Sequence, residues 1–372
     1  RELHEAARQE LEVVLGVLLH LANWALNALN RLFVLILADP LESLRLPSHE
    51  DASLSRRTIA RWGYTSFMRK LIDRTAVVTG AASGIGRATA LLLARRGCRV
   101  ALVDVNTDAL AATAAKLKDL GGACSTHVVD VANRAQMLAL PDAVLAAHGG
   151  AHILINNAGV TASKTFHEHT LDDFEWVMGV NLWGVVHGCH AFLPHLLRAD
   201  EAHIVNISSI FGVVGIPSQS SYCASKFAVR GFTESLWEEL DGTHVGVTCV
   251  HPGGVATGIA SAARMSDEGG REAMVRFFRE KTIPPAAAAA QIVDGILRGR
   301  RRVLITREAY ALDWLKRLLP VTGNRWAVAA MMKILGKQGD IAEGQAAAIS
   351  QARRPSVTPP VPIDKSTDPV NE

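Results

Sequence analysis

The sequence predicts an α/β protein built on a doubly wound parallel sheet, and three observations lead to this prediction. Short β-branched, apolar runs alternate with longer Ala/Leu-rich stretches along the middle of the chain. The runs are too apolar for strands with one face in water, so they fit strands that are covered on both faces. A glycine-rich turn joins the first run to the Ala/Leu-rich stretch that follows it, as in a strand–helix–strand unit.

The predicted strands lie within one domain, residues 71–306. Their runs are AVVTG, RVALVDV, HILINNAG, AHIVNIS and VGVTCVHPG, at 76–80, 99–105, 152–159, 202–208 and 245–253. The intervening stretches of ten or more residues are predicted helices that cover the two faces of the sheet. Helical extensions at the N-terminal and C-terminal sides complete the predicted architecture.

Composition excludes several classes of protein. With 372 residues, the chain is long enough for two domains or for one large domain with extensions. Hydrophobic residues make up 49% and charged residues 20%, which excludes wholesale disorder. The net charge is only +3 and the basic residues are mostly scattered, so no nucleic-acid partner is expected.

The N-terminal zone, residues 1–70, contains an apolar stretch at 11–37 that we interpret as an amphipathic or membrane-associating helix. Its uncharged core of 18 residues, 13–30, has the minimum length that spans a bilayer. The polar residues that form a stripe along this core at helical spacing are His20, Asn23, Asn27 and Asn30. Such a stripe is costly in hydrocarbon, so three interpretations stay open: a helix lying on a membrane or a partner, a true span, and a helix docked on the protein's own fold. A chain starting at Met68 would also contain the whole predicted domain.

The C-terminal zone is predicted to begin with a helical extension at 307–337. It has two amphipathic segments divided by Pro320, with Trp314 and Trp326 among basic residues. Such helices can rest on a membrane surface, cap a substrate cleft or pack on the sheet. The Ala/Gly/Ser-rich and then Pro/Thr/Asp-rich composition of 338–372 predicts a disordered tail.

Neither disulfides nor a metal site is indicated. The cysteines, which are odd in number, far apart and without C-x-x-C spacing, are Cys98, Cys124, Cys189, Cys223 and Cys249. A reducing, cytoplasmic location is the default, with membrane association through 11–37 as the open alternative. His187, His190 and His195 share one predicted helix, but no Cys, Asp or Glu completes a set of metal ligands at suitable spacing.

The glycine-rich turn has the features of a phosphate-binding site. It reads TGAASGIG, from Thr79 to Gly86, and opens a predicted helix. Glycine lets the backbone turn tightly and approach a pyrophosphate, while the helix offers free N–H groups and the positive end of its dipole. Asp104 ends the next predicted strand, where a carboxylate can accept hydrogen bonds from an adenosine ribose. The combination predicts a Rossmann-like dinucleotide site.

Asp104 also indicates which dinucleotide binds. Its carboxylate would repel the 2′-phosphate of NADP, and Val105 and Asn106 supply no basic residue to offset this repulsion. Ser83 precedes Gly84, at a position where a lysine or arginine would be another phosphate partner. The sequence therefore favours NAD, with NADP as the less favoured alternative.

A tyrosine and a lysine are the candidate reactive groups. Tyr222 and Lys226 lie four residues apart at the start of a predicted helix, so their side chains share one face. A neighbouring ammonium and a cationic nicotinamide would lower the pKa of the phenol, which could then shuttle a proton. Ser209 ends the preceding strand-like run, where its hydroxyl could bind a substrate oxygen. Taken alone, the Tyr-x-x-x-Lys spacing also fits an ordinary helix surface.

With these motifs together, the sequence resembles the short-chain dehydrogenase/reductase family of NAD(P)-dependent oxidoreductases, whose members carry a Thr-Gly-x-x-x-Gly-x-Gly turn and a Tyr-x-x-x-Lys pair. The resemblance implies that Tyr222 is the catalytic acid/base and that Ser209 orients and polarises the carbonyl. It implies that Lys226 binds the nicotinamide ribose and lowers the tyrosine pKa, and that Asn181 holds a water in the proton relay. The residues indicated for cofactor binding are Thr79, Gly80, Ser83, Gly84, Ile85, Gly86, Asp104, Asp130, Val131, Asn157, Ala158, Gly159, Tyr222, Lys226, Pro252, Gly253, Val255 and Thr257.

The resemblance also implies a flap after Thr257 that covers the substrate. The apolar residues expected in the flap are Ile259, Ala260, Met265, Met274, Val275, Phe277 and Phe278. Those expected in an apolar wall are Trp183, Phe211, Val213, Val214 and Ile216. These residues favour a hydrophobic secondary alcohol or ketone as substrate, of steroid, retinoid or lipid type; the alternative is that they simply seal the fold.

The family resemblance implies a homodimer or homotetramer that assembles through helices at about 171–199 and 219–241. The alternative function is a catalytically idle dinucleotide-sensing or membrane-scaffold protein that uses its terminal helices for partners. The complete set of Asn181, Ser209 and the Tyr-x-x-x-Lys pair argues against this alternative.

Overall fold

The computed structural model describes residues 68–265 and 268–334 of the chain. The helix predicted within 11–37 and the tail predicted at 338–372 lie outside the described residues. Among the described helices, none combines the length and the apolar content that crossing a bilayer requires.

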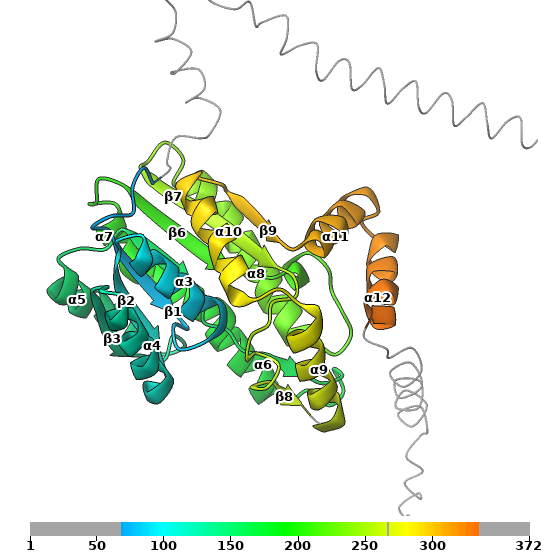
Figure 1. The fold of residues 1–372 in the computed structure, drawn as a ribbon. Coiled ribbons are helices and arrows are strands. Elements are labelled where there is room, and N and C mark those ends of the chain that lie inside the picture. Colours follow the sequence, from blue (N-terminus) through cyan, green and yellow to red (C-terminus); the bar gives the residue numbers. More distant parts are fainter. Residues whose placement is uncertain (1–67, 266–267, 335–372) are drawn as a thin grey trace, which may run out of the picture. The chain divides into compact units, whose positions relative to one another are not determined.

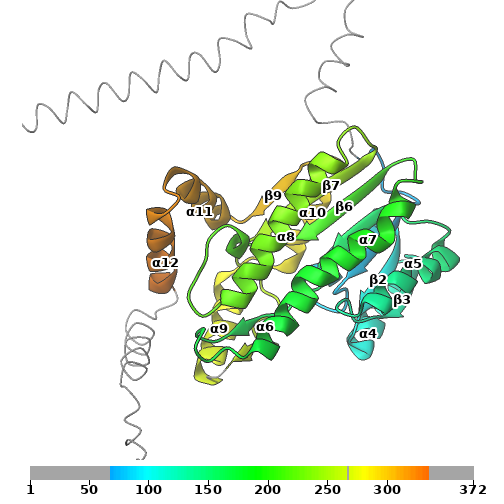
Figure 2. The same ribbon diagram turned by 180° about the vertical axis from the view of Figure 1, so that it is seen from behind.

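A seven-stranded parallel sheet runs through the centre of the described part of the chain (Figures 1 and 2). Its strands are β1 (Thr75–Thr79), β2 (Arg99–Asp104), β3 (Cys124–Val128), β4 (Ile153–Asn156), β6 (Ala202–Ile207), β7 (Val245–Pro252) and β9 (Arg302–Ile305). Their order is β3-β2-β1-β4-β6-β7-β9. The chain moves outward first to one side of β1 and then to the other, which is the doubly wound, Rossmann-like topology predicted. Ligands bind such sheets beyond the carboxyl ends of the strands, where the two halves meet.

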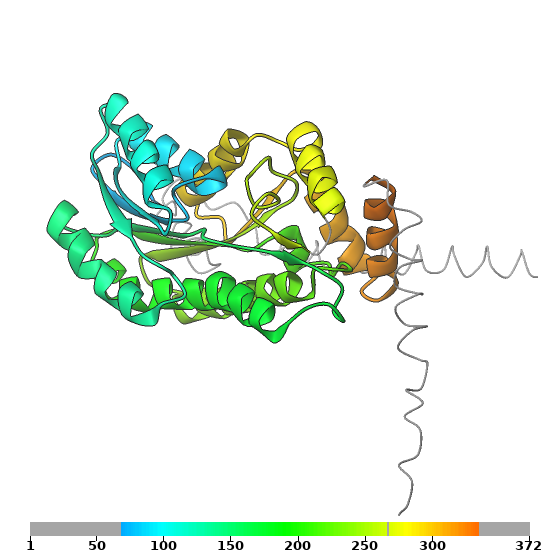
Figure 3. The same cartoon turned by 90° about the horizontal axis from the view of Figure 1, so that it is seen from below.

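Helices cover both faces of the sheet, as the edge-on view in Figure 3 shows. One face packs against α3 (Gly84–Arg95), α4 (Thr107–Asp119) and α10 (Pro285–Leu297). The other packs against α5 (Arg134–His148), α7 (Gly184–Leu196) and α8 (Ser220–Glu239). In β4, Ile153 and Ile155 join the first hydrophobic cluster while Leu154 joins the second, because successive strand residues point to opposite faces. Burial on both faces explains why the strand sequences are continuously apolar.

The remaining elements follow the carboxyl ends of the strands. They are β5 (Ala162–Ser163), α6 (Leu171–Met178), the π-helix η1 (Gly179–Trp183), the 3-10 helix η2 (Ile210–Gly212), β8 (Arg264–Met265), α9 (Glu268–Lys281), α11 (Arg307–Leu318) and α12 (Thr322–Ile334). A third, small hydrophobic cluster joins β9 to η2 and both C-terminal helices, through Leu304, Val213, Ala309 and Ala327. The C-terminal helices are therefore held beside the strand ends.

Candidate active site

The turn after β1 is shaped by close packing around its glycines. Gly80 and Gly84 have φ values of 65° and 53°, in the left-handed region that favours glycine. A Cβ at Gly86 would lie 2.2 Å from the carbonyl oxygen of Gly80, so no larger residue fits there. Within the described part of the chain, the Ser83 side chain makes no capping hydrogen bond to α3. The backbone N–H groups at the start of α3 are therefore placed to bind an anion such as a pyrophosphate.

Thr79 holds this turn against the end of β4. Its hydroxyl oxygen accepts hydrogen bonds from the backbone N–H groups of Asn157, at 2.9 Å, and Ala158, at 3.1 Å. The side-chain amide of Asn157 donates to the Thr79 carbonyl oxygen at 2.9 Å. Thr79 and Gly86 thus support the turn from behind and do not line the cavity beside it.

The strand ends open into a cavity of about 1120 Å³. This volume exceeds the roughly 300–1,000 Å³ of an ordinary small-molecule site, so it suits a dinucleotide with a substrate beside it. The predicted site residues that line the cavity are Gly80, Ser83, Gly84, Ile85, Asp104, Asp130, Val131, Asn157, Ala158, Gly159, Ser209, Tyr222, Lys226, Pro252, Gly253, Val255 and Thr257.

Asp104 is half-buried where β2 ends, beside the glycine turn. One carboxylate oxygen accepts a hydrogen bond from the backbone N–H of Ala82 and the other accepts one from Asn106, each at 3.0 Å. A carboxylate has about four acceptor positions, so these bonds leave capacity for ribose hydroxyls. The glycine cradle, the start of α3 and this carboxylate together fit a dinucleotide.

Tyr222, Lys226 and Ser209 meet at the cavity wall. Lys226 is 3% exposed, and its Nζ donates to the Ile207 carbonyl oxygen at 2.9 Å. The same Nζ lies 5.6 Å from the centroid of the Tyr222 ring. The Ser209 side chain lies close enough to the Tyr222 phenol to act on its pKa. A hydroxyl, a phenol and an ammonium therefore face one end of the cavity.

Burial shifts both titratable groups of this set. It raises the pKa of Tyr222 to about 12, although the neighbouring Ser209 side chain acts in the opposite direction. Burial lowers the pKa of Lys226 to about 8. The Lys226 ammonium lies 5.6 Å from the ring centroid, and desolvation dominates the phenol in the chain by itself; the lowering that we expect requires the cationic nicotinamide as well. At neutral pH Tyr222 is protonated and Lys226 carries its charge.

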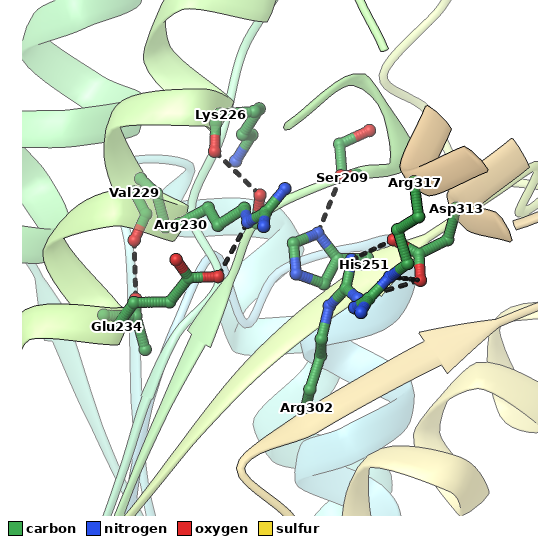
Figure 4. A network of polar contacts seen from close by, with 11 residues as sticks. Ser209, Lys226, Val229, Arg230, Glu234, His251, Arg302, Asp313 and Arg317 are labelled. Atoms are coloured by element: carbon green, nitrogen blue, oxygen red, sulfur yellow. Dashed lines mark hydrogen bonds and ion pairs between the residues drawn. The ribbon is translucent and has the colours of Figure 1, made fainter. Parts of the chain in front are cut away.

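A buried network lies behind Ser209 (Figure 4). His251 Nδ1 is 3.0 Å from the Ser209 carbonyl oxygen, and burial lowers the pKa of His251 to about 4. The neutral ring must donate this bond, because its partner can only accept. Close by, the Arg302 guanidinium donates to both Asp313 oxygens, at 2.9 and 2.6 Å, and Arg317 donates to one of them at 3.0 Å. The histidine ties the end of β7 to the segment that carries Ser209, and the arginines tie the start of β9 to α11.

Asn181 is fully buried in η1 and does not line the cavity. Its Oδ1 accepts from the Val160 backbone N–H at 2.8 Å, and its Nδ2 donates to the Val160 carbonyl and to Ser225 Oγ, each at 3.0 Å. The side chain is thus engaged with protein groups at both ends. It joins η1 to the segment after β4 and to α8, the helix that carries Tyr222.

The cavity lining as a whole is mostly apolar, although charged side chains such as Lys164, Glu168 and Glu175 also contribute to it. The ring centroids of Phe211 and Tyr222 lie 6.2 Å apart in an edge-to-face contact, and Ile216 lines the same wall. The expected flap residues that line the cavity are Ile259, Ala260, Met265, Met274, Phe277 and Phe278. Val275 is not among the lining residues, although it belongs to α9.

Three of the expected wall residues lie elsewhere. Trp183 is 53% exposed and is absent from the cavity lining. Val213 and Val214 are buried in the small cluster with Leu304, because the turn after η2 directs them towards α11 and β9. The expectation for these three residues was wrong, since the sequence does not show which way a short 3-10 helix or a π-helix turns its side chains.

Some contributions to the cavity could not be assigned to particular residues from the sequence. Thr161 and Gln219 form a buried polar pair in the wall, with the threonine hydroxyl donating to Gln219 Oε1 at 2.7 Å. Leu312 of α11 and Val328 of α12 also line the cavity. No motif marks these residues, because they reach the site only through tertiary packing.

The first part of the flap binds to the N-terminal turn of α6. β8, within the flap, pairs with β5 in a two-stranded parallel sheet. Asp173 is buried and binds cations from both strand regions, Lys164 Nζ at 2.6 Å and Arg264 Nη1 at 3.1 Å. The Arg264 guanidinium also lies 3.9 Å from the centroid of the Trp176 ring. Asp173 therefore links the flap to the rest of the described fold.

Replacing Asp173 by Asn should lower the free energy of unfolding at pH 7 by about 1–3 kcal/mol, because charged hydrogen bonds are lost. The hydrogen bond with Lys164 and the other partners lower the pKa of Asp173 to about 2. Its stabilisation is therefore complete above the unfolded pKa near 3.8 and is lost as the pH falls towards 2. Thermal unfolding of both proteins at decreasing pH should show the difference shrinking over this interval. The exposed neighbour supplies the control, Asp172→Asn, for which a comparable loss would contradict the assignment.

The fold and this arrangement define a class of enzyme, and the sequence comparisons agree. The chain matches the short chain dehydrogenase family over residues 74–268, more than half of its length. It belongs to the short-chain dehydrogenase/reductase family and is an oxidoreductase that acts on CH–OH groups with a nicotinamide cofactor.

Two relatives illustrate the likeness. The chain is 43% identical to the Mycobacterium tuberculosis protein SadH, named an oxidoreductase, over 270 residues that cover 72% of this chain and 98% of SadH. It is 33% identical to human estradiol 17-beta-dehydrogenase 11 over 247 residues, 66% of this chain and 78% of that protein.

Solved structures agree with the fold. A short-chain dehydrogenase/reductase from Burkholderia phymatum in complex with NAD superposes with a TM-score of 0.64 at 36% identity, covering 68% of this chain and 95% of that one. A short-chain dehydrogenase from Mycobacterium paratuberculosis bound to NAD gives a TM-score of 0.58 at 26% identity, covering 65% of this chain and 99% of that one.

Proposed function

We propose that this enzyme transfers a hydride between NAD and a hydrophobic secondary alcohol or ketone of steroid, retinoid or lipid type. The observation that carries the proposal is the apolar cavity that extends from the Tyr222 phenol between Phe211, Ile216 and the flap. A relative named estradiol 17-beta-dehydrogenase 11 supports a steroid-like substrate. We further propose that residues 71–306 are the catalytic domain and that 307–337 are a C-terminal extension, whose described part, 307–334, closes one side of the cavity.

Each reactive residue has its own chemical role. A bound nicotinamide would supply the hydride-transfer chemistry, with the carbinol or carbonyl carbon of the substrate as the other partner. Tyr222 takes up the proton of the alcohol or supplies one to the ketone oxygen. Ser209 donates a hydrogen bond to that oxygen and keeps it next to the phenol. Lys226 binds the nicotinamide ribose, and its ammonium stabilises the phenolate form of Tyr222.

For Asn181 we propose a positioning role. Both ends of its side chain bind protein groups, so the amide is poorly suited to hold a water directly. Through Ser225 it instead fixes the first turn of α8 and with it Tyr222. Interruptions of an α-helix by a π-helix occur frequently at functional sites, and η1 places Asn181 in such an interruption.

NAD is the proposed cofactor because Asp104 presents a carboxylate at the strand end. Replacing Asp104 by Ala should raise KM for NAD by about 10- to 100-fold, since hydrogen bonds to a charged group contribute about 1.5–3 kcal/mol. KM for NADP should rise less, because the repulsion of its 2′-phosphate disappears. Initial rates with each cofactor measure both effects. Asp104→Asn keeps an acceptor for the Ala82 N–H and controls for damage to the turn. A marked preference of the unchanged enzyme for NADP would contradict the proposal.

An activity screen tests the proposed function as a whole. Secondary alcohols and ketones in a series of increasing apolar surface are offered with NAD or NADH, and the reduced nicotinamide is followed by its absorbance. The expected result is that kcat/KM rises with the apolar surface of the substrate, by about tenfold for each 1.4 kcal/mol of added burial. Preference for small polar alcohols would contradict the substrate class while leaving the family assignment intact.

We propose a homodimer or homotetramer that assembles through α7 and α8. Trp183 and Phe227 expose large apolar side chains near the start of α7 and on α8. Burying these side chains between subunits would stabilise the assembly in proportion to the apolar area removed from water. Size-exclusion chromatography with light scattering measures the mass; a monomer at all concentrations would contradict this assembly.

A further inference from the structure

The helices α11 and α12 lie at one edge of the described fold (Figures 1 and 2). Their outer faces carry large exposed apolar side chains. On α11, Tyr310, Trp314 and Leu318 are spaced four apart and form one stripe, in which Trp314 is 62% exposed. Val321 lies exposed in the connection, and Trp326 on α12 is 68% exposed. These five side chains are called the outer patch below. A gathering of this kind marks an interaction surface more often than scattered apolar residues do.

Positive charge borders the outer patch. Arg307 and Arg317 share the exposed face of α11, and Arg325 precedes Trp326. Neither Arg307 nor Arg325 has an ion-pair partner within the described ranges 68–265 and 268–334. Of the two acids between 307 and 326, Asp313 is buried with arginine partners and Glu308 is exposed. The surface around the patch is therefore complementary to an anionic partner.

The inner sides of the same two helices belong to the substrate end of the cavity. Ala311 and Leu312 of α11 and Ala327 and Val328 of α12 line it. The outer patch and the apolar cavity thus lie on two sides of the same pair of helices.

We propose that the outer patch docks this enzyme on the surface of a lipid bilayer that contains anionic headgroups. Exposed Trp and Leu side chains with arginines around them are the chemistry of helices that lie in the headgroup region. A lipophilic substrate would then pass from the bilayer between α11 and α12 into the cavity; this second step rests on the proposed function.

A second copy of the chain is a poorer partner for this face. In a two-fold interface the same patch faces itself, so the arginines of both copies would be brought together. Like charges placed opposite each other in an interface cost several kcal/mol. An anionic lipid surface offers the opposite charge without this repulsion.

Flotation of the full chain with vesicles of phosphatidylcholine and phosphatidylglycerol tests the docking. The double variant Trp314→Ser, Trp326→Ser should lower the partition coefficient by at least about tenfold, because two interfacial aromatic side chains are lost. Arg307→Gln and Arg325→Gln should each lower it by about fivefold on these vesicles, and much less on phosphatidylcholine alone. Val128→Ser with Leu138→Ser, two exposed apolar residues on β3 and α5, is the matched control and should float like the unchanged chain.

The double tryptophan variant separates this surface from any other membrane contact of the chain. If it floats as well as the unchanged chain, the contact lies elsewhere and the proposal is overturned. Unchanged flotation with a lower oligomeric mass would make the patch an interface between copies, which also overturns it.

A kinetic measurement tests substrate passage separately. In the double variant, kcat/KM should fall for a substrate supplied in vesicles and stay unchanged for a water-soluble substrate without vesicles. Equal kcat/KM with vesicle-borne substrate would contradict passage through the patch. Absence of turnover in the unchanged enzyme would contradict the proposed function, while flotation would still decide the docking.

Discussion

Replacing Tyr222 by Phe lowers kcat by about 10²- to 10⁴-fold while the affinity for the dinucleotide stays nearly constant. This range is the usual contribution of a positioned acid/base group, and only the phenolic oxygen is removed. The ring keeps its contact with Phe211, so the fold is retained. Stopped-flow or steady-state rates give kcat, and quenching of tryptophan fluorescence gives the Kd for NADH.

The direction of the reaction matters for this variant. Burial holds the pKa of Tyr222 near 12, so the phenol is protonated at neutral pH and is ready to donate to a ketone. Oxidation needs the phenolate, so kcat/KM for an alcohol should rise with pH in the unchanged enzyme and lose this rise in the variant. Tyr310→Phe, an exposed tyrosine on α11, is the matched control and should behave like the unchanged enzyme. Substantial turnover by Tyr222→Phe would remove this residue from the mechanism.

Replacing Lys226 by Met should lower kcat/KM by at least about 10²-fold and yet leave the protein as stable as before or more so. The loss of activity follows from removing a charged hydrogen-bond donor and the cation beside the phenol. The stability is expected to be equal or higher because the substitution replaces a buried ammonium by an apolar chain of similar length. The free-energy cost of burying the charge is thereby removed. Such a trade is typical of residues that are kept for function.

The pH dependence of unfolding distinguishes this account from simple damage. Burial lowers the pKa of Lys226 from 10.5 to about 8, so the unfolded chain binds more protons between these two values. Stability contributed by this position should therefore rise with pH between about 8 and 10.5 in the unchanged protein and stay flat in Lys226→Met. The exposed Lys116→Met is the control. If Lys226→Met unfolds at a much lower temperature at every pH, the lysine is a structural residue and its assigned role fails.

The sequence allowed the central fold to be predicted because its strands are buried on both faces. The apolar runs around β1, β4 and β7 can be recognised as strands from the sequence. Burial on both faces removes the alternation of polar and apolar residues that is seen in strands with one face in water. β3 is different: it lies at the edge of the sheet and reads CSTHV, half exposed and mixed in polarity. Such a strand has no apolar run by which to recognise it.

The parts of the candidate site that the backbone forms could be predicted from the sequence. The parts whose side-chain positions depend on tertiary packing could be predicted less well. The glycine turn needs residues without a side chain, so Gly80 and Gly84 could be placed from the sequence. The engagement of Asn181 depends on a π-helix that spacing does not reveal. The pKa of Tyr222 depends on how completely the fold desolvates it, which no local pattern reports. The substrate wall formed by α11 and α12 likewise depends on which helix faces turn inward.

Label transfer tests the central claim most directly. An alcohol found in the activity screen is prepared with deuterium on its carbinol carbon and oxidised by the enzyme with NAD, and the reduced cofactor is analysed by mass spectrometry. Because the C–H bond should pass its hydrogen with both electrons to the nicotinamide while Tyr222 receives only the hydroxyl proton, the account predicts one deuterium in each NADH formed. NADH without the label, or label released into water, would contradict it.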